Sequence, residues 1–212
     1  GNEIFIARDF EASYPLTVKE GTKILINMSG YNITTGNLIT NNGELKIYDT
    51  SEEVGTITSA RTIENNGALE IEKVNVTETT NNNTINNNAS GTLKITDAVI
   101  TAKSGYAVNT YGVIELNGNS QLLGSNYALL NNQENLELSG GVINGIVNNK
   151  SLIINEGTII NSSAESIIYN NVGNTTTTIN GGVLTGKNGL YCTAGTSHYI
   201  MNGGEIKTTE KG

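Results

Sequence analysis

A repeat of about 22 residues runs through most of this chain and limits its possible folds more than any other feature. Segments 39–47 and 63–71 share the pattern Ile-x-Asn-Asn-Gly-x-Leu-x-Ile, and looser copies follow downstream. Repetition at one fixed period indicates a stack of similar structural units rather than a globular core. The first apolar position of the unit falls at Ile39, Ile63, Ile85, Ala107, Leu129, Ile146, Ile168 and Leu190.

Two further strand-like segments follow this position in each unit. Apolar and polar residues alternate in them, as in the pairs Leu45/Ile47 and Leu69/Ile71, so one face of each segment is predicted to be buried. Sustained helical spacing is absent from the sequence. The pattern therefore predicts an all-β fold, a single-stranded parallel β-helix of about nine coils with about 22 residues and three short strands per coil.

The first residues follow the repeat less closely than the rest. Ile24 and Ile26 already match the alternating pair of later units. We therefore expect residues 21–212 to form the β-helix and residues 1–20 to form an N-terminal cap or a first partial coil. Because a third strand comes just before Gly212 and no capping segment follows it, we expect the chain to be a fragment of a longer protein.

An asparagine lies two residues after the first apolar position in nearly every unit, and therefore on the same face of the strand. A buried amide is costly unless it is hydrogen-bonded. Asparagines stacked one coil apart meet this requirement, because each donates to one neighbour and accepts from the other. We interpret the column as a structural ladder that ends at Cys192, expected to be a small buried apolar residue. The predicted ladder consists of Asn41, Asn65, Asn87, Asn109, Asn131, Asn148 and Asn170.

The position between the apolar residue and the asparagine is predicted to face outward. Its residues are polar in the first half of the chain and apolar or aromatic in the second. A contiguous apolar stripe on an exposed face often marks an interface, and tyrosine suits carbohydrate or protein contacts because it combines an apolar ring with a polar tip. The column reads Thr40, Glu64, Asn86, Val108, Leu130, Val147, Tyr169 and Tyr191.

The candidate ligand-binding residues are the last five of this column, Val108, Leu130, Val147, Tyr169 and Tyr191. Three interpretations of the stripe are open. It is covered by a neighbouring domain or another copy of the chain, or it binds a glycan or a host protein. In the third interpretation it only reflects the preference of apolar residues for strands, or an error in the assignment of inward and outward positions.

The composition excludes several classes of partner. Twelve Lys and Arg residues against 20 Asp and Glu give a net charge of −8, with no basic cluster to contact a nucleic-acid backbone. No apolar run approaches the length of a membrane span, so no membrane insertion is expected. The chain has one cysteine, Cys192, and one histidine, His198, which excludes a disulfide framework and a Cys/His metal site. We therefore expect no cofactor and no metal.

No catalytic residues are expected either. The three aspartates, Asp9, Asp49 and Asp97, lie about two repeats apart and are not predicted to converge. Glu115 and Glu137 lie one coil apart, a separation that retaining glycosidases also use, but we interpret them as part of a solvated face. Charges alternate along this outward column, which predicts cross-strand pairing. The column consists of Lys46, Glu70, Lys94, Glu115 and Glu137.

Segment 17–34, Thr-Val-Lys-Glu-Gly-Thr-Lys-Ile-Leu-Ile-Asn-Met-Ser-Gly-Tyr-Asn-Ile-Thr, resembles the opening coil of the pectin-lyase-like right-handed parallel β-helix modules of bacterial surface proteins. The Asn-Asn-Gly-x-Leu-x-Ile segments and segment 180–186, Asn-Gly-Gly-Val-Leu-Thr-Gly, look like the repeat of these modules. The resemblance covers about residues 14–208. It implies a right-handed helix and an adhesin-type module that is secreted or displayed on the cell surface.

These observations predict a non-catalytic extracellular module of a bacterial surface protein, a stiff rod with an adhesive or structural role. Its expected partner is a host glycan, an extracellular protein or a neighbouring domain of the same protein. Its expected location is the bacterial cell surface or the surrounding medium. Two alternatives stay open because one fold hosts many functions: a phage tail fibre or tailspike, and a polysaccharide lyase or glycoside hydrolase.

Overall fold

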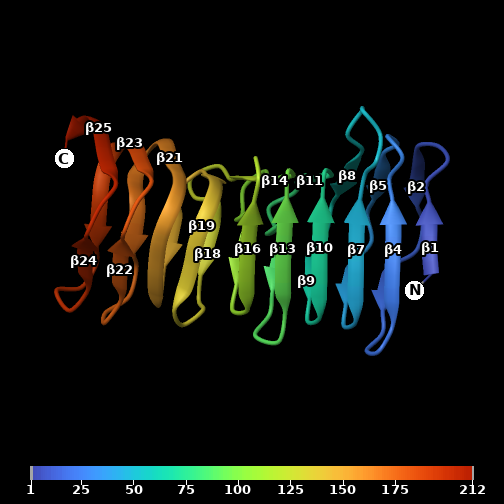
Figure 1. Ribbon diagram of the computed structural model, residues 1–212, viewed down its shortest axis with the longest axis horizontal. Coiled ribbons are helices and arrows are strands. Elements are labelled where there is room, and N and C mark those ends of the chain that lie inside the picture. Colours follow the sequence, from blue (N-terminus) through green and yellow to red (C-terminus); the bar gives the residue numbers. More distant parts are fainter. Residues whose placement is uncertain (1, 212) are drawn as a thin grey trace.

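The chain forms a rod of stacked β-strands, with the N-terminus and the C-terminus at opposite ends (Figure 1). The computed structural model describes residues 2–211, with the backbone alone described at residues 162, 164 and 211. These residues contain 25 strands and no helix. Neighbouring strands pair in parallel. The predicted all-β parallel β-helix is confirmed, with about nine coils of about 22 residues.

Each of the first six coils contributes three short strands. In the first three coils these are β1 (Asn2–Phe5), β2 (Phe10–Ala12), β3 (Leu16–Val18), β4 (Lys23–Asn27), β5 (Ile33–Thr35), β6 (Ile39–Asn41), β7 (Glu44–Tyr48), β8 (Thr56–Ser59) and β9 (Ile63–Asn65). In the next three they are β10 (Ala68–Glu72), β11 (Asn75–Glu78), β12 (Ile85–Asn87), β13 (Thr92–Thr96), β14 (Val99–Ala102), β15 (Val108–Thr110), β16 (Val113–Asn117), β17 (Gln121–Leu123) and β18 (Leu129–Asn131).

In the C-terminal coils some strands continue around the corners and become longer. The remaining strands are β19 (Leu136–Ile143), β20 (Ile146–Asn148), β21 (Ser151–Asn170), β22 (Thr176–Ile179), β23 (Val183–Cys192), β24 (His198–Met201) and β25 (Glu205–Lys211). Residues 2–20, at the other end, contribute three strands that pair one by one with the next coil, β1 with β4, β2 with β5 and β3 with β6.

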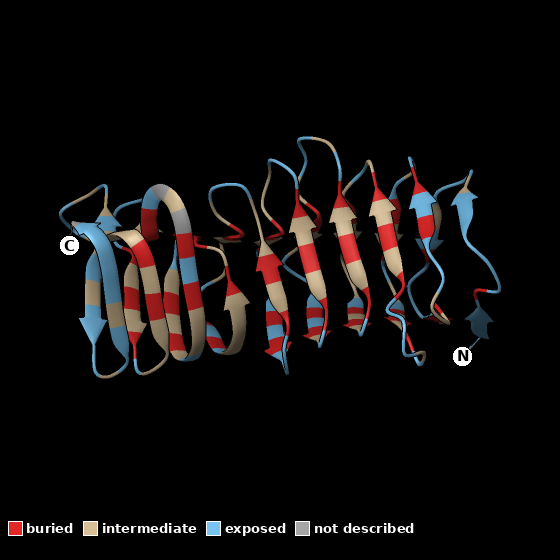
Figure 2. Ribbon diagram, turned by 90° about the horizontal axis from the view of Figure 1, so that it is seen from above, coloured by how far each residue is buried: buried red, intermediate tan, exposed pale blue. Residues whose placement is uncertain are grey.

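The core consists of side chains that point into the coil and stack on their equivalents in the next coil. Ile24, Leu45 and Leu69, for example, are successive partners in the sheet formed by β1, β4, β7, β10, β13 and β16. Buried residues alternate with intermediate or exposed ones along the central strands, whereas the end strands β1 and β24 are largely exposed (Figure 2). Burial of each inward Leu, Ile or Val contributes on the order of 2 kcal/mol to folding.

The predicted asparagine ladder exists, in two runs. In the first, Asn41 donates to Oδ1 of Asn65 and Asn65 donates to Oδ1 of Asn87, each at 2.8 Å. The second amide hydrogen of these side chains reaches a backbone carbonyl, that of Ala68 for Asn41 and that of Thr92 for Asn65. Each amide is 0% exposed, and its hydrogen-bonding capacity is nevertheless used.

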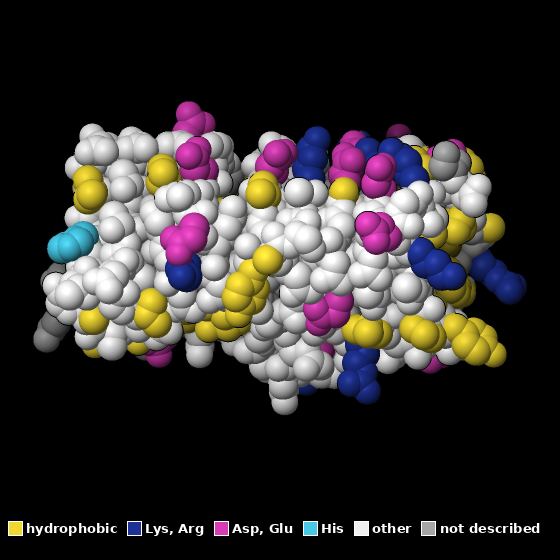
Figure 3. Space-filling model, turned by 90° about the horizontal axis from the view of Figure 1, so that it is seen from below, with side chains coloured by type: hydrophobic (Ala, Val, Ile, Leu, Met, Phe, Trp, Pro, Cys, Tyr) yellow, Lys and Arg dark blue, Asp and Glu magenta, His cyan; other side chains and the backbone are white. Residues whose placement is uncertain are grey.

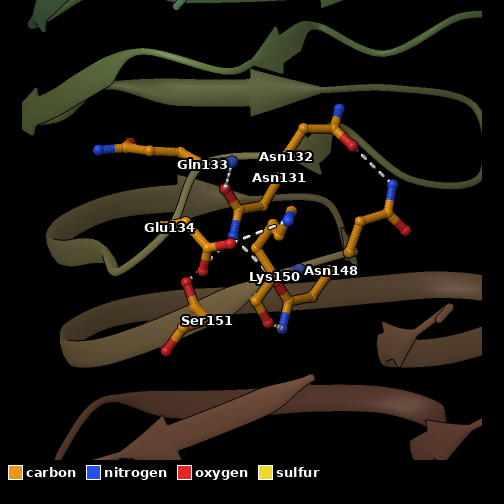
Figure 4. A network of polar contacts seen from close by, with 8 residues as sticks. Asn131, Asn132, Gln133, Glu134, Asn148, Lys150 and Ser151 are labelled. Carbon is orange, nitrogen blue, oxygen red and sulfur yellow. Dashed lines mark hydrogen bonds and ion pairs between the residues drawn. The ribbon is translucent and has the colours of Figure 1, made fainter. Parts of the chain in front are cut away.

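The second run starts at Asn131, in the corner drawn in Figure 4. Asn131 donates to Oδ1 of Asn148 at 2.8 Å. Asn148 donates in turn to Oδ1 of Asn170 at 3.0 Å. The backbone carbonyls of Ser151 and Lys150 accept the second hydrogens of Asn131 and Asn148. This run of the ladder therefore connects three successive coils through buried side chains at one corner.

One predicted member, Asn109, is not part of this ladder. The amide of Asn87 instead donates to Oγ1 of Thr110, at 3.0 Å. Thr110 donates its own hydroxyl hydrogen to the carbonyl of Gly112 at 2.7 Å, so it passes no hydrogen bond to Asn131. The two runs are separate for this reason.

The same shift of one residue affects the first apolar position of this coil, which the sequence predicts at Ala107. The structure pairs Val108 with Ile85 on one side and Leu129 on the other, and Val108 is 0% exposed. The prediction that Val108 faces outward is therefore wrong, and Asn109 takes that outward place. The physical reason is size, because a β-branched valine fills the column between Ile85 and Leu129 better than alanine does.

Cys192 and Tyr199 close the inner ladder at its C-terminal end. Asn170 places its amide nitrogen 3.9 Å from Sγ of Cys192. Cys192 is half-buried rather than buried as expected, because no described strand pairs with it on the C-terminal side. The Tyr199 hydroxyl lies 2.9 Å from the carbonyl of Ile168 and 2.7 Å from that of Tyr191, and burial raises the pKa of Tyr199.

A second asparagine ladder, which the sequence analysis did not predict, runs along the outer edge of the same corners. Asn149 donates to Oδ1 of Asn132 at 2.7 Å, and Asn171 donates to Oδ1 of Asn149 at 3.0 Å. Asn132 in turn donates to Oδ1 of Asn109 at 2.9 Å. These hydrogen bonds point toward the N-terminus, opposite to those of the inner ladder. Asn42, Asn66 and Asn88 form the same arrangement in earlier coils.

We expect the two ladders to differ in how much stability each asparagine provides. Asn148→Ala leaves one amide hydrogen of Asn131 without a partner in the core and removes one of the two hydrogen bonds that Oδ1 of Asn170 accepts, so we expect a loss of about 2 kcal/mol. Asn149→Ala is the matched control on the outer ladder, where water replaces the lost partner, and should cost less than about 1 kcal/mol. Urea unfolding of the two variants measures the difference. Equal losses would show that the inner ladder is not a main source of stability.

Candidate functional site

Four of the five candidate ligand-binding residues share one outward column. Leu130, Val147, Tyr169 and Tyr191 are successive partners on β18, β20, β21 and β23. Val108 is inside the coil and takes no part in this column. The column therefore begins to be apolar at Leu130 and continues along the rod axis to the C-terminal coils.

Leu130, Val147 and Tyr169 line a groove of about 490 Å³. Val147 is only 3% exposed, which places it at the base of the groove rather than on an open surface. Tyr106 and Tyr127 line the same groove and come from the corners just before β15 and β18. The volume falls within the range of about 300–1,000 Å³ that is usual for ligand pockets.

Three tyrosines form a row along the groove, of which Tyr127 and Tyr169 line it and Tyr191 lies beyond it. The ring centroids of Tyr127 and Tyr169 are 6.3 Å apart, and those of Tyr169 and Tyr191 are 5.4 Å apart. The planes are tilted by 30° and 36°, a usual geometry for neighbouring aromatic rings. The hydroxyl of Tyr127 lies 3.0 Å from Oγ of Ser166, and that of Tyr169 accepts a hydrogen bond from Thr193 at 2.8 Å. These contacts hold the rings in place.

The groove is polar at its margin and almost without charge. Asn149 and Asn171, members of the outer ladder, contribute amides to the lining. Glu165 is the single charged residue of the described lining. Burial raises the pKa of Tyr106 and of Tyr127, so both phenols stay neutral at physiological pH. Uncharged polar atoms and backbone make up most of the face seen in Figure 3, with hydrophobic side chains in separate patches.

A larger groove, of about 570 Å³, lies over the charged face of the first sheet. The predicted charge column is confirmed there as far as Glu115, since Lys46, Glu70, Lys94 and Glu115 are successive partners. Nζ of Lys46 lies 3.1 Å from Glu70 and 2.6 Å from Glu72, and the hydrogen bond to Glu72 raises the pKa of Lys46. The described lining of this groove contains no aromatic residue. Lys23 pairs with Glu44 and Lys46 with Glu70 in its lining. These ion pairs favour as the binding site the groove lined by Leu130, Val147 and Tyr169, which we call the tyrosine groove.

The three aspartates lie in separate corners, where each accepts hydrogen bonds from the backbone. Asp9 accepts from the N–H of Asn32 at 2.7 Å, and Asp97 from that of Asn119 at 2.8 Å.

Asp49, which is 3% exposed, holds the corner between β7 and β8. Its carboxylate accepts from the N–H groups of Gly30, Ser51 and Gly55 and from the Ser51 hydroxyl. Burial opposes its charge, but the hydrogen bonds from Ser51, Gly55 and Gly30 outweigh burial and lower the pKa of Asp49. Its role is therefore structural.

Comparison with known protein families, with curated proteins and with solved structures finds no match to this chain. Within residues 2–211 no helix is long and apolar enough to cross a membrane. The same residues contain no group of three or more His, Cys, Asp or Glu side chains placed to hold a metal ion. The candidate site therefore rests on the geometry of the groove itself.

The corrected register predicts different responses to substitution at two adjacent positions. Val108→Ala removes two methyl groups from the packed interior, and we expect it to cost on the order of 2 kcal/mol. Asn109→Ala removes an outward side chain of the outer ladder, where water replaces the lost partners, and should cost less than about 1 kcal/mol. Thermal unfolding followed by circular dichroism compares the two. A greater loss for Asn109→Ala would mean that the register inferred from the sequence was right and the structure wrong.

Asp49 should make stability depend on pH. Because its folded-state pKa is lowered, its stabilising contribution is fully present above the ordinary value of about 4 and is lost as the pH falls through the lowered value. Asp49→Asn should therefore be less stable than wild type at pH 7, and should lose less stability on acidification to about pH 2. The melting temperature measured across this range gives the comparison.

Glu52→Gln is the matched control for Asp49→Asn, since Glu52 is an exposed carboxylate in the same corner. Its melting temperature should follow that of the wild type at every pH. An Asp49→Asn variant that loses as much stability in acid as the wild type would contradict the assigned role.

Proposed function

We propose that this chain is a non-catalytic extracellular module of a bacterial surface protein, a stiff rod that binds a partner through the groove beside Tyr169. The observation that carries the proposal is the row of three tyrosines next to a groove of about 490 Å³. An aromatic row with amides at its margin is a surface suited to binding, because it offers apolar contact and hydrogen bonds together.

The architecture supports the role of a rod. Parallel strand pairing connects each coil to the next, and two asparagine ladders reinforce most of these connections from Asn41 to Asn171. A site built on paired strands keeps its geometry better than one on mobile loops, because its side chains are fixed by their neighbours. We place the module among the pectin-lyase-like right-handed β-helices of adhesin type on the resemblance of segment 17–34 and the repeats that follow it.

The non-catalytic part of the proposal is supported by the uses of the acidic side chains. Asp9, Asp49 and Asp97 each hold a corner, in different coils. Glu70 and Glu72 pair with Lys46. Hydrolysis or elimination on a polysaccharide needs acidic or basic groups that converge on one bond. Incubation with neutral and acidic polysaccharides should therefore yield no new reducing ends and no unsaturated products, and release of either would contradict this part.

Tyr169→Ala should abolish most partner binding while leaving the fold intact, because Tyr169 is at the centre of the row. The measurement is binding of the fluorescently labelled chain to fixed epithelial cells and to immobilised extracellular-matrix proteins. Tyr111→Ala is the control, since Tyr111 is 50% exposed and does not line the groove. Circular dichroism confirms folding of both variants. Equal binding by wild type and Tyr169→Ala, or no binding by the wild type, would count against the proposal.

A further inference from the structure

The tyrosine groove has the chemistry of a carbohydrate site. We infer that its ligand is a neutral glycan chain that lies along the rod axis, with successive sugar rings over Tyr169 and Tyr191. This inference rests on the proposed function, because it names the chemical class of the partner at the same site. Four properties of the groove carry it: its size, the spacing of its rings, its amides and its lack of positive charge.

The size of the groove favours a small chain over a folded protein. A specific protein–protein interface buries about 800 Å² on each partner and involves roughly 20–30 residues a side. The groove of about 490 Å³ has instead the dimensions of a small-molecule site. Its base, formed by Val147, is nearly fully buried, so a flat protein surface would not reach it. A narrow chain of single sugar rings would reach the base of the groove.

The rings repeat in the direction that a linear polymer would follow. Tyr169 and Tyr191 are register partners in adjacent parallel strands, so their rings follow one another at the coil spacing along the axis. A pyranose ring has an apolar face of C–H bonds that packs against an aromatic ring, while its hydroxyl groups point outward from the edge. Tyr191 is 57% exposed and extends the row beyond the groove, where a second sugar would rest.

The outer asparagine ladder supplies the hydrogen-bonding groups that sugar hydroxyls need. Each amide nitrogen carries two hydrogens. The amide of Asn149 donates one to Asn132, and the amide of Asn171 donates one to Asn149. Both residues line the groove, so the second hydrogen of each is available to a ligand there. The ladder also fixes the orientation of these amides before any ligand arrives, which lowers the entropy lost on binding.

The charge of the site determines which glycans fit. The described lining contains Glu165 and no Lys, Arg or His, and the chain as a whole has a net charge of −8. Uronate or sulfate groups would meet a negative field without a cation to pair with them. The structure therefore selects neutral sugars such as hexoses and N-acetylhexosamines, and it disfavours acidic polysaccharides.

Isothermal titration calorimetry tests the inference with neutral manno-, cello- and chito-oligosaccharides, from monosaccharide to hexasaccharide, against oligogalacturonate and heparin fragments. We expect at least one neutral series to bind, with affinity that rises as a second ring reaches Tyr191. Tyr169→Ala and Tyr191→Ala should each weaken that binding about tenfold, which corresponds to about 1.4 kcal/mol. Tyr111→Ala should leave it unchanged, and circular dichroism checks that every variant is folded.

The outcomes separate this inference from the proposed function. If no neutral series binds, or if the acidic fragments bind more tightly, the neutral-glycan inference is overturned. If an extracellular-matrix protein binds in a way that depends on Tyr169, the proposed function stands while the glycan inference fails. If Tyr169→Ala has no effect on any ligand, both are wrong.

Discussion

The hydrogen bond between one buried asparagine and the next is the interaction on which the rest of this rod depends. A buried amide without a partner would cost about 1–3 kcal/mol, roughly what one inward apolar side chain contributes to folding. Asn131, Asn148 and Asn170 therefore have to lie directly above one another, and this fixes the register of every strand beside them. Since side chains alternate along a strand, the same register sets which residues face outward. The row of Leu130, Val147, Tyr169 and Tyr191 follows from it.

The sequence predicts the architecture well because each repeat contributes one residue to each stack of equivalent side chains along the rod. The paired apolar positions, the charge column through Lys46 and most of the inner ladder are confirmed. An even spacing of the repeats favours Ala107 for the inward column, whereas the local sequence pattern favours Val108. Segments 104–107 and 125–128, Ser-Gly-Tyr-Ala and Ser-Asn-Tyr-Ala, are copies of each other. Aligning them pairs Val108 with Leu129, as the structure does.

The candidate site could be predicted only in part. Residues within strands have a direction fixed by the period of two, so the outward positions of Tyr169 and Tyr191 were accessible from the sequence. Tyr106 and Tyr127 belong to corners, where no such period applies, and their place in the groove depends on the path of the backbone. The outer ladder was missed for the same reason, since Asn149 and Asn171 follow their strands rather than lying within them.

Because one ladder is buried and the other lies at the surface, we expect their side-chain amides to differ clearly in the rate of hydrogen exchange. Nuclear magnetic resonance of the ¹⁵N-labelled protein resolves the side-chain NH₂ groups of asparagine. The NH₂ protons of Asn148 should exchange with deuterium far more slowly than those of Asn149, because only the former are buried and bonded on both sides. Exchange at the same rate in both residues would contradict the account, since the coils would then not be held in register by a buried ladder.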